Sequence, residues 1–104
     1  MGEQQLPQQL PKNDPNAAGA ARDRKISIAA FDAKCKALES MRRHAEADDD
    51  QVALGLIKSL GDSQVLHISS AIGETAEHAL IPGMDRGQVI EDLGALVELL
   101  GRLS

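Results

Sequence analysis

Residues 86–103 read RGQVIEDLGALVELLGRL, and this stretch carries the clearest helical pattern in the chain. At about 100° per residue, its large apolar side chains spread over about 180° of a helical wheel. They are Val89, Ile90, Leu93, Leu96, Val97, Leu99, Leu100 and Leu103. A helix that rests on a single core needs an apolar stripe only about 100° wide. The pattern therefore predicts a helix whose apolar face is wider than one small core covers.

Three glycines lie beside this apolar face, and they are spaced by seven residues: Gly87, Gly94 and Gly101. Each costs about 1 kcal/mol relative to Ala in a helix interior. Their alignment indicates a seam where another backbone approaches closely, although a chain with nine glycines can also align three without a function. At the start of the helix, Asp85 and Gln88 form a capping box.

Three further helices are expected upstream. The first covers about 26–47, because Ile28, Phe31, Cys35, Leu38 and Ala45 form one apolar stripe. The second covers about 49–60 and follows a capping box of Asp48 and Gln51. It is expected to bury Val52, Ala53, Leu56, Ile57 and Leu60 and to end at Gly61.

The third upstream helix covers about 63–81, after a cap at Asp62 or Ser63 and before the turn Pro82-Gly83. The short connections favour neighbouring helices that pack antiparallel. Residues 1–25 are rich in Gln, Pro and Asn and are expected to form a flexible, disordered tail. The predicted fold is therefore an all-α, small antiparallel bundle of three to four helices in residues 26–104.

Composition limits the classes of partner. The net charge is −5, and because the first 25 residues contain four basic and three acidic side chains, residues 26–104 carry −6. A surface this acidic makes nucleic-acid binding unlikely. No apolar run approaches the roughly 20 residues of a membrane span, and the N-terminus lacks a secretion-signal pattern. With a single cysteine, Cys35, we expect a reducing cytoplasmic environment and no membrane association.

The sequence offers little that could carry chemistry. Glu74 and His78 lie one helical turn apart, but a third metal ligand is missing from their helix, so we interpret them as a solvated face and expect no metal. No nucleotide-binding loop and no catalytic triad is recognisable. We therefore expect that the protein is not an enzyme, needs no cofactor and has no small-molecule substrate.

The leading hypothesis is a small acidic protein-binding module of the regulator, chaperone or inhibitor type, which self-associates as a homo-oligomer. With one Phe and no Trp or Tyr, the chain has a thin core that a partner would complete. The predicted interaction residues follow the apolar face and the glycine seam of the last helix. They are Val89, Leu93, Gly94, Leu96, Leu99, Leu100, Gly101 and Leu103.

Two alternatives remain open. Histidine phosphotransfer domains are four-helix bundles of about this size with a solvent-facing histidine, and His67 is the candidate phosphoacceptor. Their usual signature has a lysine three residues later, where this chain has Ser70. A nucleic-acid-associated regulator would instead need the fold to gather its basic residues into one patch. Those residues are Arg22, Arg24, Lys25, Arg42 and Arg43.

Overall fold

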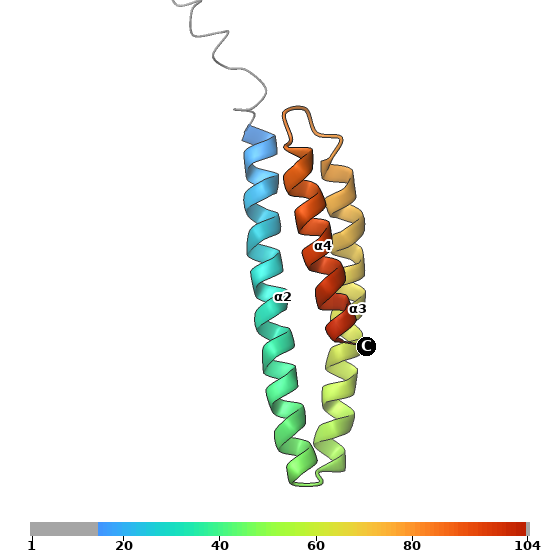
Figure 1. The fold of residues 1–104 in the computed structure, drawn as a ribbon. Helices are drawn as coiled ribbons and strands as arrows, with labels where there is room; N and C mark the ends of the chain where they lie inside the picture. Colours follow the sequence, from blue (N-terminus) through green and yellow to red (C-terminus); the bar gives the residue numbers. More distant parts are fainter. Residues whose placement is uncertain (1–14, 104) are drawn as a thin grey trace, which may run out of the picture.

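The computed structural model describes residues 15–103, and the described part of the chain forms three long helices. They are α2 (Pro15–Ala47), α3 (Gln51–His78) and α4 (Arg86–Arg102). Consecutive helices run in opposite directions and pack side by side (Figure 1). The expected all-α antiparallel bundle is thereby confirmed. Residues 1–14 of the expected tail lie outside the described residues.

Helix α2 begins at Pro15, so the predicted start of the first helix near residue 26 is wrong. Proline suits a first helical turn, because its missing N–H would have no partner there. Residues 15–25 of the expected tail belong to the bundle, since Ala17 and Arg24 are buried. The polar composition of this segment concealed its helical register.

Helix α3 is continuous, so the predicted break at Gly61 and the predicted cap at Asp62 or Ser63 are wrong. The single helix begins after Asp50, whose carboxylate accepts a hydrogen bond from the backbone N–H of Ala53 at 3.0 Å. Asp50 therefore caps α3 in place of the predicted Asp48. The turn before it is closed by Asp49, which adopts a positive φ of 52° that Asp tolerates better than most residues.

The core-facing residues of each helix follow an alternating spacing of three and four residues, which is the heptad pattern of coiled coils. On α2 they are Ala17, Ala21, Arg24, Ile28, Phe31, Cys35, Leu38, Arg42 and Ala45. On α3 they are Leu54, Ile57, Gly61, Gln64, Ile68, Ala71, Thr75 and His78. On α4 they are Val89, Asp92, Leu96 and Leu99, and the same spacing continues to Leu103 just after the helix. All three helices thus share one seam that contains several polar side chains.

Helix α4 covers only part of the α2–α3 hairpin (Figure 1). Its 17 residues span about 26 Å, whereas the 33 residues of α2 span about 50 Å. We call the part with α4 the three-helix half (15–39, 61–78 and α4) and the remainder the two-helix half (40–47 and 51–60). The central apolar cluster of Cys35, Ile68, Leu96 and Leu99 lies in the three-helix half.

Candidate functional site

A buried polar layer crosses the three-helix half. Arg24 Nε on α2 donates a hydrogen bond to Asp92 Oδ2 on α4 at 2.7 Å, and the two side chains are only 2% and 8% exposed. The other carboxylate oxygen of Asp92 accepts from Gln88 Nε2 at 3.0 Å. Arg24 Nη1 lies 3.1 Å from His78 Nδ1 on α3. One charged pair and its neighbours therefore connect all three helices.

This layer was not foreseen from the sequence, because Arg24 fell in the expected tail and only the apolar and glycine positions of the last helix were considered as site residues. The signal that could have found both is their place in the heptad seam, between Ala17 and Ile28 on α2 and between Val89 and Leu96 on α4. A shift of the helices that separated Arg24 from Asp92 would leave a buried charge unpaired, which is costly. This layer therefore favours the observed register of the three helices. Arg24 Nη2 has no hydrogen-bond partner among the described residues.

Helix α4 divides the predicted interaction residues into three groups. Val89, Leu96 and Leu99 are buried between the helices and form the chain's own core. Leu93, Leu100 and Leu103 are half-buried, and the last two pack against the central cluster. Gly94 and Gly101 are exposed, and a Cβ built on either would meet nothing within 4 Å. The predicted close approach of a backbone at these glycines is therefore absent within the described chain.

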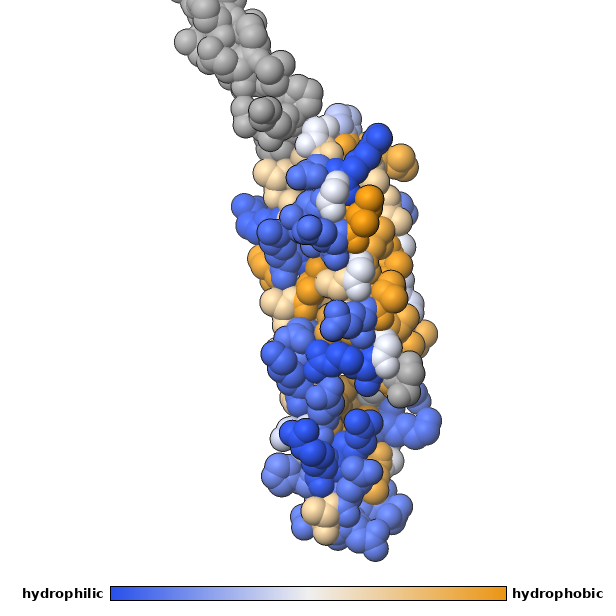
Figure 2. Space-filling view, viewed as in Figure 1, coloured by the Kyte–Doolittle hydropathy of each residue, from blue (hydrophilic) through white to orange (hydrophobic). Residues whose placement is uncertain are grey.

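The outer face of α4 nevertheless carries a second heptad-spaced line of residues. Gly87, Ile90, Gly94, Val97 and Gly101 are all exposed and alternate glycine with a β-branched side chain. Figure 2 shows hydrophobic side chains gathered along α4 and its border with α3, whereas the lower part of this face is mainly hydrophilic. None of these residues lines any of the hollows described below.

The most developed concave surface lies on the opposite side of the α2–α3 hairpin. Two adjoining hollows of about 520 and 260 Å³ share Met41 and Leu60, and no residue of α4 lines either one. We call this surface the hairpin groove. Its lining consists of Lys34, Ala37, Leu38, Ser40, Met41, His44, Ala45, Asp48, Asp50, Ala53, Leu56, Ile57, Leu60, Ser63, Gln64 and His67.

The middle of the hairpin groove is apolar and open to solvent. Leu56 is 62% exposed and Leu60 is 54% exposed, and Met41 faces them from α2. The expectation that Val52, Leu56 and Leu60 are buried is wrong, because two helices alone cannot cover both flanks of their own seam. Within the described chain, the groove therefore leaves large apolar side chains in water.

A third hollow, of about 360 Å³, lies on the α4 side of the hairpin, where α4 ends. Its apolar surface comes from Leu38, Leu54 and Ile57. Arg42 also lines it, at a heptad position that holds a core residue nearer the N-terminus of α2. The hollow also borders Cys35, and burial raises the pKa of that thiol. The raised pKa disfavours the reactive thiolate.

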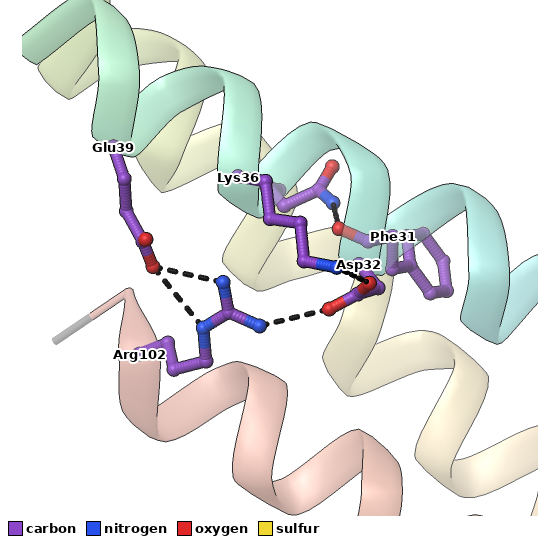
Figure 3. Close-up of polar contacts among 6 residues, drawn as sticks. Phe31, Asp32, Lys36, Glu39 and Arg102 are labelled. Carbon is purple, nitrogen blue, oxygen red and sulfur yellow. Dashed lines mark hydrogen bonds and ion pairs between the residues drawn. The ribbon is translucent and has the colours of Figure 1, made fainter.

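The end of α4 is tied to α2 by an ion-pair cluster (Figure 3). Arg102 donates to Glu39 Oε1 through Nε at 3.1 Å and Nη2 at 2.9 Å, and to Asp32 Oδ1 through Nη1 at 2.8 Å. Lys36 Nζ lies 3.0 Å from Asp32 Oδ2. Hydrogen bonds from Lys36 and Arg102 lower the pKa of Asp32, and Glu39 and Asp32 raise the pKa of Arg102. The cluster fixes where the three-helix half ends.

The remaining candidate residues are dispersed. His67 is exposed at one end of the hairpin groove. His78 contacts Arg24, so the interpretation of His78 as a solvated partner of Glu74 is wrong. In residues 15–103 no group of His, Cys, Asp or Glu side chains is arranged to hold a metal ion.

The basic residues proposed to form one patch are separated. Arg24 is buried, and Lys25 and Arg42 lie about 26 Å apart along α2. Among the described helices, none has the length and apolar character needed to cross a membrane. Comparisons of this chain with family models, curated proteins and solved structures found no match.

Proposed function

We propose that this protein is a helical protein-binding module of the regulator, chaperone or inhibitor type, which docks through its hairpin groove and self-associates. The observation that carries this proposal is the exposure of Leu56 and Leu60 in a continuous concave surface on the side of the hairpin away from α4. An apolar groove between two helices matches the helix-in-groove mode of recognition.

The energetics support a docking role for this surface. Burial of one Leu or Met side chain stabilises an association by about 1.5–3 kcal/mol before entropic costs. Three such side chains, Met41, Leu56 and Leu60, line this one groove. The flank away from α4 gains more from a partner than the α4 flank, because α4 already covers the central cluster there.

A matched pair of leucine variants tests the proposal. Leu60 lies in the groove, whereas Leu66 is 71% exposed on the same helix and lines none of the three hollows described above. We expect Leu60→Glu to abolish self-association in sedimentation velocity, and Leu66→Glu to leave it unchanged, with equal helicity by circular dichroism. Equal masses for both variants and the native chain would contradict docking through this groove.

Phosphotransfer at His67 is a second candidate, favoured by one observation: the exposed His67 lines the same hollow as Lys34, whose ammonium group would attract a phosphoryl group. Incubation with acetyl phosphate tests it, read by mass spectrometry under alkaline conditions that preserve phosphohistidine. An added phosphate on the native chain, absent from His67→Ala and retained in His44→Ala, would support it. An unmodified native chain would exclude acetyl phosphate as a donor.

A further inference from the structure

The two ends of the hairpin groove carry opposite charge. At one end, Lys34 of α2 lies with His67 of α3. At the other end lie Asp48 and Asp50, next to the turn between the helices. Met41 and Leu60, which line both hollows, form the apolar waist between the two ends.

The charged ends are placed evenly about this waist. Lys34 precedes Met41 by seven residues and Asp48 follows it by seven, so each lies two helical turns, about 10.5 Å, from the waist along α2. On α3, His67 follows Leu60 by the same seven residues. A two-fold axis through the waist therefore exchanges the basic end of one groove with the acidic end of another.

We infer that the occupant of the hairpin groove is the same groove of a second copy, turned antiparallel about a two-fold axis at Met41 and Leu60. The four helices of two hairpins then form a bundle, and α4 of each copy stays on the outside. Lys34 of each copy meets Asp48 of the other. Such an interface is self-complementary, as a two-fold dimer requires.

The two parts of this surface have different roles. The apolar waist supplies the affinity, because it removes Met41, Leu56 and Leu60 of both copies from water. The exposed charge pairs add little affinity and instead select the orientation. A parallel arrangement would instead bring the two basic ends together and the two acidic ends together.

Charge reversal tests the orientation. In Lys34→Glu, both ends of the antiparallel dimer bring acids together, and in Asp48→Lys both bring lysines together. We expect each variant alone to dimerise about 5- to 30-fold more weakly. Mixed in equal amounts, they form a heterodimer in which every end pairs opposite charges. Native mass spectrometry should then show heterodimers above the statistical half.

Two controls make this result specific. Lys58→Glu changes the net charge equally but lies on the α4 side of the hairpin, so its self-association should match that of the native chain. The double variant Lys34→Glu with Asp48→Lys should recover native affinity. A statistical mixture of dimers from the two single variants would overturn the antiparallel arrangement.

Crosslinking reads the register directly. With a short bis-maleimide, Lys34→Cys mixed with Asp48→Cys should crosslink, and Met41→Cys should crosslink with itself; the native chain, whose Cys35 is buried, serves as the background. Self-crosslinking of Lys34→Cys would overturn the arrangement.

The antiparallel arrangement rests on the proposed function, which is self-association through the hairpin groove, and different results would contradict each of them. If Leu60→Glu separates the dimer while the crosslinks are parallel, the groove remains the docking site and only the arrangement is wrong. If the dimer resists Leu60→Glu, or the native chain stays monomeric at millimolar concentration, self-association through the groove is wrong as well.

Discussion

The two halves of the hairpin differ in what covers their common seam. In the three-helix half, α4 covers one flank, and Ile68 is fully enclosed at 0% exposure. In the two-helix half, the seam continues with the same spacing, but Leu54 and Ile57 line an open hollow on the flank that α4 covers elsewhere. The opposite flank, with the largely exposed Leu56 and Leu60, is covered by α4 in neither half. The difference lies in the length of α4 and not in the apolar content of α2 and α3. A flank that α4 does not reach is thus what remains available for another chain.

Polar residues are also used differently in the two halves. The buried pair of Arg24 and Asp92 adds no apolar burial to the three-helix half, but it permits one register only. At the hairpin groove, which continues into the two-helix half, Lys34 and Asp48 lie at the rim in contact with solvent, where they can select a partner's orientation. The first pair acts within the fold and the second acts between chains.

The largest effect is expected from breaking the polar layer of the three-helix half. Asp92→Ala leaves the guanidinium of Arg24 buried without its counter-charge, which destabilises a fold by about 3–5 kcal/mol. Urea denaturation followed by circular dichroism measures this loss. Glu91→Ala, on the exposed neighbouring position, should change stability by less than about 0.5 kcal/mol.

A double variant separates burial of a charge from loss of a contact. Arg24→Leu combined with Asp92→Leu removes both charges together and should recover most of the stability that Asp92→Ala loses. If the double variant is as unstable as Asp92→Ala, the ion pair itself stabilises the bundle and the register argument is incomplete.

A smaller loss of stability is expected when one apolar side chain in each half is replaced by alanine. Ile68→Ala opens a cavity in an enclosed core and should cost about 2–5 kcal/mol. Leu56→Ala, measured at a concentration where the chain is monomeric, should cost less than about 1 kcal/mol because the side chain is already in water. Equal losses from the two variants would show that the two-helix half is closed in the monomer.

The smallest change in stability is expected from the ion-pair cluster of Arg102, which lies at the boundary between the halves. Because Lys36 and Arg102 lower the pKa of Asp32, its carboxylate stabilises the fold above the ordinary Asp pKa, and this contribution disappears as the pH falls through the lowered value. Arg102→Ala should therefore weaken the loss of stability between about pH 5 and pH 2. Thermal denaturation of the native chain and of Arg102→Ala across that pH range tests this expectation. The same pH dependence of stability in both proteins would contradict the role given to Arg102 beside Asp32.

The sequence predicted the last helix well and the others poorly, for a common reason. In α4 the seam is mostly Leu and Val and the cap at Asp85 is unambiguous, so the expected 86–103 matches Arg86–Arg102 closely. In α3 the seam includes Gly61, Gln64 and His78, so its apolar period is interrupted and one helix was divided into two. Polar residues in a heptad seam conceal the helix from an argument based on apolar spacing.

The candidate site depends on a relation that local patterns do not contain. Leu56 and Leu60 have the spacing of core residues, but they lie on the flank of the hairpin away from α4, where no helix of the described chain covers them. Conversely, Val89, Leu96 and Leu99 belonged to an apolar arc that was judged too wide for one core, but the contacts of α4 with two helices bury them.

Hydrogen–deuterium exchange at two protein concentrations, below and above the midpoint of self-association, tests the central contrast most directly. Docking of a second copy should slow exchange in residues 40–47 and 51–60, because association disfavours local opening where it buries surface. Exchange in the core-facing turns around Thr75 and Leu96, which lie outside the groove, should not depend on concentration. Protection that rises along α4 instead, or that does not change in the two-helix half while a dimer forms, would contradict the account.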